Sequence, residues 1–363
     1  MDVRVAPPQA LSRMPRARPE IWLLWLCVAL AFRPAAGAEY RAASYVFGTI
    51  AKITIVGDDA AAAHDAAGAV LHEFDRLHRE LHAWQPGPLV ALNAAIARGD
   101  RTIRTTPEIA ELIVRAQRLE ARSDGAFDPA IGRLVALWNF HRDTPGGPLP
   151  GASDIERLAG ARPRMADLRV AGDIVTSANP LVQLDFGGYA KGYALDRAAR
   201  ILHARGVANA LIDVGGNVMA LGEAGNRPWR VAIEAPRGAG TLGTLELRDG
   251  EAMGTSGDYR RYYEIAGRRY AHIIDPRTGY PVCGVESVTV LVAPGPEAGA
   301  LSDAASKPIF IAGREGWREA AMHMGVAGAL LVDSDGVAHM TAPLRARLRA
   351  AGAPEQRGRY AAR

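Results

Sequence analysis

The sequence predicts an α+β fold in which mixed or antiparallel sheets are flanked by helices. Segments with a helical spacing of apolar residues and segments with strand character occur in blocks, not in strict alternation. Apolar residues make up 48% of the 363 residues and charged residues 23%, as in globular proteins, which excludes a disordered chain. The two cysteines are too few for a disulfide-dense scaffold or a four-thiolate zinc site.

The first 38 residues have the features of a secretory signal peptide. A basic segment with Arg16 and Arg18 precedes an apolar run at 21–32, and residues 36–38 (Ala-Gly-Ala) fit a cleavage site. The run is shorter than the roughly 20 residues of a membrane-spanning helix. We therefore expect cleavage before Glu39 and export of the chain, with an uncleaved anchor as the alternative.

The first half of the body predicts mainly helices. Residues 44–57 are rich in β-branched and aromatic residues, which predicts a strand pair or one long strand. Val70, Phe74 and Leu77 lie at helical spacing within a helix expected over 59–83. Thr106-Pro107 is typical of a helix start, and this helix is expected to end near 122. Residues 129–140 also have helical character, and a loop rich in proline and glycine follows at 144–151.

The second half predicts mainly strands. A helix is expected over 189–205, ended by Gly206. Alternation predicts strands at 210–214, 229–234, 241–247, 252–255, 259–264, 271–274 and 285–291. Helices at 297–312 and 315–324 and strands at 329–332 and 337–340 complete the pattern.

The positive charge belongs to the two ends of the chain. The net charge is +4, but residues 1–38 contribute five arginines against two acidic residues, and residues 344–363 contribute six arginines against one. Residues 39–343 therefore carry a net negative charge, and no nucleic-acid partner is expected. We expect one domain over 39–343 and a basic tail over 344–363, which more often forms a solvated helix end than a binding arm.

A glycine-rich segment, 184–196, leads from a predicted strand into a helix. Gly187 and Gly188 would let backbone N–H groups approach a ligand, the helix N-terminus favours anions, and Lys191 adds a positive charge. The segment lacks the GxxxxGK[ST] pattern of a P-loop. A phosphate or nucleotide site and a plain strand-to-helix turn both fit this pattern.

Two further groups of residues carry candidate chemistry. The 255–258 turn (Thr-Ser-Gly-Asp) suits hydrogen bonding to a ring edge or a phosphate, and His272 follows on a nearby strand as a structural or catalytic residue. Asp303 and Lys307 share one helix face, either as a surface ion pair or with the carboxylate holding a divalent cation. Asp128 alternatively serves only as the cap of a helix that begins at Pro129.

Together these motifs resemble the ApbE family of FAD:protein FMN transferases. Its elements occur here in order at 47–49, 125–129, 184–196, 212–216, 255–259, 272–279 and 302–313. The resemblance implies an ApbE-like, T-fold-type α+β domain and a periplasmic enzyme, soluble or loosely membrane-associated. Such an enzyme cleaves the diphosphate of FAD and attaches FMN through a phosphoester to a threonine or serine of an acceptor flavoprotein. Acceptors in the family include subunits of membrane electron-transfer complexes.

The resemblance also assigns roles to single residues. His272 matches the general base and a FAD contact, and Asp303 and the backbone carbonyl of Gly188 match ligands of Mg²⁺. The remaining residues implied in FAD binding are Phe47, Trp84, Ala126, Phe127, Asp128, Lys191, Thr255, Ser256, Gly257 and Asp258.

The chain departs from the family pattern at Lys307, where the family has a threonine that helps to bind the metal. A lysine ammonium offers no acceptor to a cation. It therefore either competes with Mg²⁺ or substitutes for it beside the phosphate. Residues 85–89 also lack the acidic and serine character of the family. Two alternatives to the transferase follow: a hydrolase that releases FMN and AMP from FAD, and a non-catalytic FAD-binding protein.

Overall fold

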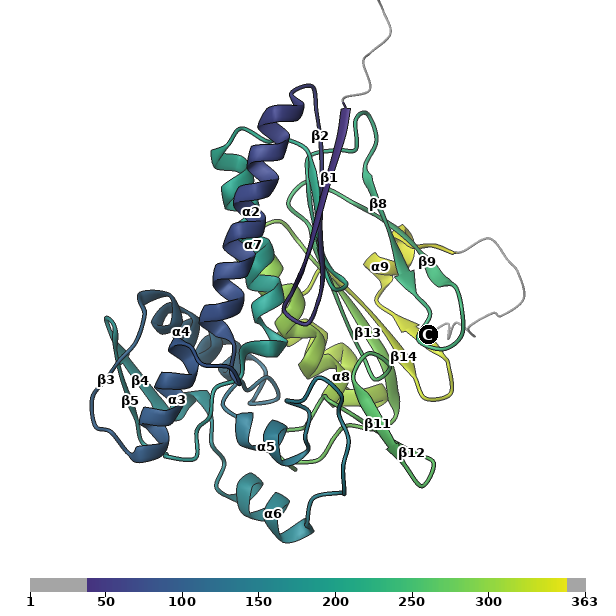
Figure 1. Ribbon diagram of the computed structural model, residues 1–363. Helices are drawn as coiled ribbons and strands as arrows, with labels where there is room; N and C mark the ends of the chain where they lie inside the picture. The colour runs from purple at the N-terminus through teal and green to yellow at the C-terminus, as the bar shows by residue number, and fades with distance from the viewer. Residues whose placement is uncertain (1–37, 351–363) are drawn as a thin grey trace, which may run out of the picture. The chain divides into compact units, whose positions relative to one another are not determined.

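The computed structural model describes residues 38–350 (Figure 1). The predicted signal peptide and most of the basic tail lie outside these residues, so both stay predictions. None of the described helices combines the length and apolar character needed to cross a membrane.

An eight-stranded antiparallel sheet forms the centre of the fold. Its strand order is β1-β2-β6-β7-β10-β13-β14-β15. The β1–β2 hairpin turns at Phe47 and Gly48, which have φ values of 54° and 70°. These positive values are typical of a two-residue type I′ turn and confirm a strand pair in this region. The strands are β1 (Ala38–Val46), β2 (Thr49–Gly57), β6 (Ala210–Val214), β7 (Asn217–Leu221), β10 (Ala252–Gly257), β13 (Val285–Val292), β14 (Gly328–Asp333) and β15 (Ala338–Met340).

Three long helices cover one face of this sheet: α2 (Ala60–Leu81), α7 (Ala190–Ala204) and α8 (Ala298–His323) (Figure 1). Asp59 caps α2 by accepting a hydrogen bond from Ala62 N at 2.9 Å. The predicted helices over 59–83 and 189–205 are confirmed to within two residues. The two helices predicted over 297–312 and 315–324 are both present and meet at a kink at Gly313, where φ is 63°.

The opposite face of the sheet packs against a small three-stranded sheet, β16-β9-β8, and α9. Leu291 and Leu330 of the large sheet share a core with Trp229 and Leu245. The described start of the basic tail is docked here, because Arg347 pairs with Glu251 at 2.7 Å. The elements are β8 (Trp229–Glu234), β9 (Thr241–Leu247), α9 (Ala342–Arg347) and β16 (Arg349–Ala350).

Shorter elements complete the fold at one end of the helices (Figure 1). The helix predicted from Pro107 is confirmed as α4. No signal in the sequence predicted α3, α6, β7 or the sheet β3-β5-β4. The elements are α3 (Pro88–Arg98), β3 (Ile103–Arg104), α4 (Pro107–Arg122), α5 (Gly132–Leu137), α6 (Ala152–Gly160), β4 (Leu168–Ala171), β5 (Ile174–Ser177), β11 (Tyr262–Ile265) and β12 (Arg268–Ala271).

Three predicted elements are wrong in their bounds. The strand predicted over 259–264 begins only at Tyr262, as β11. The helix predicted over 129–140 begins only at Gly132, because the preceding backbone pairs with Gln183 and Asp185. The strand predicted over 271–274 ends at Ala271, because the β11–β12 hairpin turns at Ala266 and Gly267 and thereby fixes its register. His272 therefore lies just beyond the end of β12.

Candidate functional site

A glycine contact between α7 and α8 builds the centre of the candidate site. A Cβ atom on Gly192 would lie 2.2 Å from the carbonyl oxygen of Gly299, and one on Gly299 would lie 2.4 Å from that of Gly192. Because neither residue carries a side chain, the two helices approach closely enough for Gly192 N–H to donate to Asp303 Oδ2 at 3.0 Å. Gly254 allows the same close approach between β10 and α8, since its Cβ atom would lie 2.3 Å from Ser302 O.

Asp303 lies between two lysines. Lys307 Nζ donates to Asp303 Oδ1 at 2.5 Å and to the backbone carbonyl of Asp303 at 2.7 Å. Lys191 Nζ lies 3.5 Å from Asp303 Oδ2 and donates to the carbonyl of Gly187 at 3.1 Å. The Asp303 side chain is 1% exposed and that of Lys307 16%. The predicted ion pair therefore exists, but it is buried rather than on the surface.

Burial and charge act in opposite directions on this cluster. Burial alone would raise the pKa of Asp303, but the ammonium groups of Lys191 and Lys307 outweigh it and lower that pKa to about 2. Burial lowers the pKa of Lys307 to about 8, against the attraction of Asp303. Gly188 lies beside this cluster, because its Cβ atom would be 3.2 Å from Lys307 Cε.

His272 is half-buried and is oriented by a backbone carbonyl. Its Nδ1 lies 3.1 Å from the carbonyl oxygen of Arg261, which can only accept a hydrogen bond. This bond assigns the proton to Nδ1 and leaves a lone pair on Nε2. Burial, together with the positive charges of Lys307, Lys191 and Arg261, lowers the pKa of His272 to about 3, so the ring is neutral at physiological pH.

A row of rings runs from Phe47 to His82, and a hydrogen bond joins His82 to the backbone of Trp84. The Phe47 ring lies 5.6 Å from that of His78, which lies 5.2 Å from that of His82. His82 Nδ1 accepts a hydrogen bond from Trp84 N at 3.1 Å. The hairpin turn of β1–β2 is therefore joined to the segment after α2, and we call Phe47, His78, His82 and Trp84 together the aromatic surface.

Trp84 in turn connects this surface to His272. Its Nε1 donates to Asp185 Oδ2 at 3.2 Å, and its ring lies 4.9 Å from that of His141. Arg261, whose carbonyl orients His272, donates to the carbonyl of Arg142 at 2.6 Å. His141 Nδ1 and Arg261 Nε are buried without a hydrogen-bond partner, so two polar atoms at this place can bond to a ligand.

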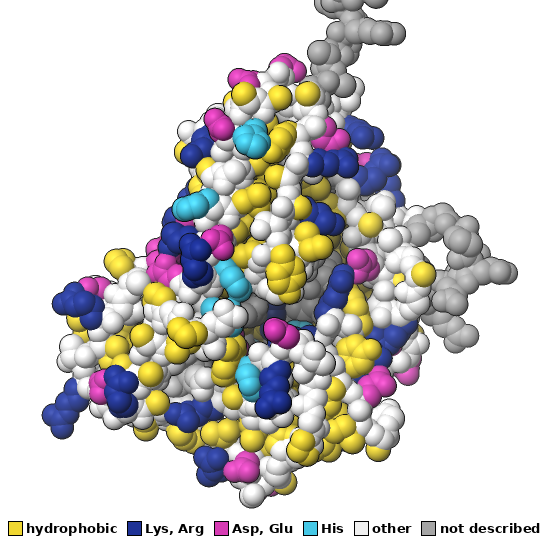
Figure 2. All heavy atoms as spheres, in the orientation of Figure 1, with side chains coloured by type: hydrophobic (Ala, Val, Ile, Leu, Met, Phe, Trp, Pro, Cys, Tyr) yellow, Lys and Arg dark blue, Asp and Glu magenta, His cyan; other side chains and the backbone are white. Residues whose placement is uncertain are grey.

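Figure 2 shows a hollow at the centre of the displayed face, with histidine side chains at its rim and basic side chains nearby. The predicted residues Phe47, Trp84, Lys191, His272 and Asp303 come from five separate segments. The contacts described above join four of them in two groups: the aromatic surface, and the lysine cluster formed by Asp303, Lys191 and Lys307. His272 is linked to the lysine cluster by the charges of Lys307 and Lys191 that act on its ring.

The 126–128 segment lies behind this region and is largely buried. The Phe127 ring lies 6.0 Å from that of Tyr189, next to the start of α7. Asp128 Oδ1 accepts from Ala130 N at 2.8 Å, but the N-cap residue of α5 is Ile131, so the predicted capping role of Asp128 is wrong. Burial raises the pKa of Asp128 to about 8.

The residues of the 255–258 turn contact different parts of the structure. Ser256 Oγ lies 2.7 Å from Ser306 Oγ, one residue before Lys307, so Ser256 borders the lysine cluster. Thr255 bonds to Thr289 across the sheet and does not join that cluster, because successive side chains of a strand point to opposite faces.

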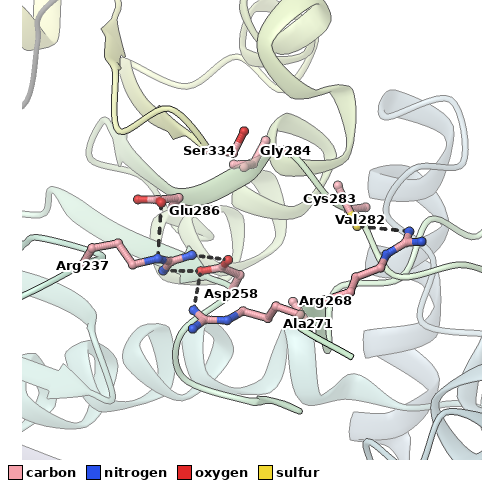
Figure 3. A pocket seen from close by; sticks show the side chains of 12 residues that line it. Arg237, Asp258, Arg268, Ala271, Val282, Cys283, Gly284, Glu286 and Ser334 are labelled. Atoms are coloured by element: carbon pink, nitrogen blue, oxygen red, sulfur yellow. Dashed lines mark hydrogen bonds and ion pairs between the residues drawn. The ribbon is translucent and has the colours of Figure 1, made fainter. Parts of the chain in front are cut away.

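Asp258 faces a pocket of about 430 Å³ (Figure 3). The Arg237 guanidinium bonds to both of its carboxylate oxygens, at 2.8 and 2.6 Å, and also lies 3.3 Å from Glu286 (Figure 3). Arg268 of the same pocket lies 3.7 Å from the sulfur of Cys283, which is exposed. The role of Gly257 and Asp258 in FAD binding stays a prediction.

Sequence reasoning missed Arg237, Asp185 and the carbonyl of Arg261. Asp185 lies within the glycine-rich segment and could have been singled out as an acceptor. Arg237 is one of forty arginines, and the role of Arg261 rests on a backbone atom, so neither gives a signal in the sequence.

Sequence comparison with known proteins identifies the family of this chain. A sequence model of the ApbE family matches residues 47–331. The FAD:protein FMN transferase of Rhodobacter capsulatus is 45% identical over 306 residues, which are 84% of this chain and 58% of that relative. That of Treponema pallidum (strain Nichols) is 34% identical over 285 residues, covering 73% of this chain and 78% of the relative.

Two solved structures share the fold. The ApbE protein from Thermotoga maritima superposes with a TM-score of 0.77 at 30% identity, covering 86% of this chain and all of that one. The flavinyl transferase ApbE from Pseudomonas stutzeri, in its apo form, gives a TM-score of 0.75 at 30% identity, covering 87% and 98%. The predicted α+β fold class is confirmed.

Fold and site together define the class of protein to which these relatives belong, the flavin transferases. Within that class the chain belongs to the ApbE family.

Proposed function

We propose that this chain transfers FMN from FAD to a threonine or serine hydroxyl of an acceptor protein and forms a phosphoester. The observation that carries the proposal is a His272 whose ring is oriented by the Arg261 carbonyl and whose pKa is lowered by burial and by the charges of Lys307 and Lys191. A base and two cations at one place suit the attack of a hydroxyl on a diphosphate.

In this reaction the acceptor oxygen attacks the phosphorus on the riboflavin side of the FAD diphosphate. A new oxygen–phosphorus bond forms, the bond from that phosphorus to the bridging oxygen breaks, and AMP leaves with the bond's electron pair. His272 Nε2 takes the hydroxyl proton. Lys191 and Lys307 stabilise the charge on the phosphate oxygens as the bridging bond breaks.

Binding of FAD also tunes the base. In the free protein burial, together with the charges of Lys307 and Lys191, keeps the pKa of His272 near 3. The diphosphate would bring negative charge next to the same ammonium groups and thereby offset their part of this lowering, so the pKa of His272 rises when FAD binds.

The resemblance implies a Mg²⁺ ion held by Asp303 and the carbonyl of Gly188, but the residues at this place do not fit one. The Lys307 ammonium group donates a hydrogen bond to Asp303 Oδ1, so a positive charge already lies beside this oxygen. Within residues 38–350 no three His, Cys, Asp or Glu side chains gather closely enough to hold a metal ion.

The proposal also covers the cellular location of the chain and the identity of its acceptor protein. The 1–38 segment supports export to the periplasm, and the family resemblance supports a subunit of a membrane electron-transfer complex as acceptor. Osmotic-shock fractionation with N-terminal sequencing tests the location. A mature chain that starts at Glu39 in the periplasmic fraction is expected, and a chain that keeps residues 1–38 in the membrane contradicts it.

Incubation of the purified chain with FAD and a candidate acceptor tests the activity. In-gel flavin fluorescence on the acceptor is the expected result. Release of FMN and AMP without an acceptor favours the hydrolase, and tightly bound, intact FAD favours the non-catalytic binding protein.

A further inference from the structure

The oxygen atoms that a metal would need at Asp303 already have partners. Lys307 bonds to Oδ1 at 2.5 Å and to the backbone oxygen of Asp303 at 2.7 Å. Gly192 N–H bonds to Oδ2 at 3.0 Å, and Lys191 Nζ lies 3.5 Å from the same atom. A divalent cation at this carboxylate would have to share its oxygens with these donors or displace them.

The charge of the cluster also favours an anion over a cation. Two ammonium groups and one carboxylate leave one net positive charge around an aspartate that is 1% exposed. In such a buried place, repulsion between a divalent cation and two ammonium groups is only weakly screened. A phosphate oxygen is attracted by the same charges.

The Lys307 side chain is positioned for a second role besides the ion pair. Its stem lies beside Gly188, where a Cβ atom would be 3.2 Å from Lys307 Cε. An ammonium group has three N–H donors, and two of those of Lys307 bond to Asp303. One donor remains for a ligand, and the partial exposure of 16% gives a ligand access to it.

We infer that the Lys307 ammonium replaces a divalent cation at Asp303, and that this chain binds a diphosphate ester with Lys191 and Lys307 and without metal. The inference rests on the proposed function for the identity of that ester, FAD. The claim that no divalent cation binds at Asp303 depends on Asp303, Lys191 and Lys307 alone, and it is tested without FAD.

Binding of Mn²⁺ to the full chain, followed by electron paramagnetic resonance of the free ion, provides this first test. The wild-type chain is expected to bind no Mn²⁺ at Asp303. Lys307→Thr supplies an uncharged oxygen and is expected to raise the Mn²⁺ affinity by about tenfold or more. Lys52→Thr makes the same substitution at an exposed position of β2 and is expected to behave as the wild type. Equal Mn²⁺ affinities of wild type and Lys307→Thr would overturn the inference.

Should Lys307→Thr fail to fold, the wild-type chain and Asp303→Asn decide the question. Absence of bound Mn²⁺ from the wild type supports the inference. Mn²⁺ bound by the wild type and lost in Asp303→Asn overturns it.

The second test measures FAD affinity by the quenching of flavin fluorescence, in Mg²⁺ and in EDTA. The wild type is expected to have the same affinity in both, within about twofold, whereas Lys307→Thr is expected to bind about tenfold more tightly in Mg²⁺ than in EDTA. A wild-type affinity that falls about tenfold in EDTA overturns the inference. If the wild type binds FAD in neither buffer, the proposed function fails, and the Mn²⁺ measurement still decides the part concerning the metal.

Discussion

Lys307 Nζ lies 2.5 Å from Oδ1 of Asp303, one helical turn away on α8, and this contact is buried. Lys191 joins the same carboxylate from α7. The spacing of Asp303 and Lys307 along the helix is enough to predict the ion pair. The burial of this ion pair and the addition of Lys191 to it depend on the crossing of α7 and α8.

His272→Ala is expected to leave FAD bound and to stop transfer. General-base catalysis contributes about 10²–10⁴-fold to a rate, so a loss of this size is expected in the rate of acceptor flavinylation. FAD affinity serves as the control, since the lysines and the aromatic surface remain. Unchanged turnover in the variant would exclude His272 from the proton transfer.

The pH dependence of kcat/KM for FAD follows from the free protein. His272, with a pKa of about 3, is neutral throughout the range from pH 5 to 7, so no acid limb near pH 6.5 is expected. Lys307 acts in its charged form, which is lost as the pH rises through its pKa of about 8, so kcat/KM is expected to fall above pH 8. Steady-state rates from pH 5 to 9.5 check both limbs, and an acid limb near pH 6.5 contradicts the assignment.

Gly192→Ala is expected to destabilise the protein and weaken FAD binding. The new Cβ atom would lie 2.2 Å from Gly299 O and 2.7 Å from Asp303 Cβ, so α7 and α8 must separate. Overpacking of this kind costs about 1–3 kcal/mol in the free energy of unfolding, measured by urea denaturation.

Gly68→Ala is the matched control for this variant. Gly68 lies exposed on α2 with nothing within 4 Å of a Cβ atom, so this substitution is expected to stabilise the protein by about 0.5–1 kcal/mol. A Gly192→Ala protein as stable as the wild type would show that the helix crossing tolerates a side chain.

Asp128→Asn is expected to flatten the dependence of stability on pH. The pKa of Asp128 is about 8 in the folded protein, above its usual value of 3.8. Between about pH 4 and 8 the unfolded chain therefore releases a proton that the folded protein keeps, and the free energy of unfolding falls as the pH rises.

The variant loses this fall, which for such a shift is about 4 kcal/mol between pH 5 and pH 8. Urea denaturation at pH 5 and pH 8 measures the difference, with Asp65→Asn on the exposed face of α2 as control. An equal fall in wild type and Asp128→Asn would contradict the protonated state of the buried carboxyl group.

The sequence by itself determined the elements whose signals are local. The helical spacing around Phe74 and the Thr106-Pro107 start need no partner outside their own segment, and the structure has both. The order of the motifs also determined the family, which the comparison confirmed.

Only the tertiary structure decided which motif residues meet. Gly192 and Gly299 are far apart along the chain, and only their contact brings Asp303 within reach of both Lys191 and Gly192 N–H. The short α5 and the end of β12 before His272 likewise follow from backbone pairing with distant segments or from a hairpin turn. Hydrogen bonds and contacts over long sequence separations override local propensity, which is why the lysine cluster could be suspected but not assembled from the sequence.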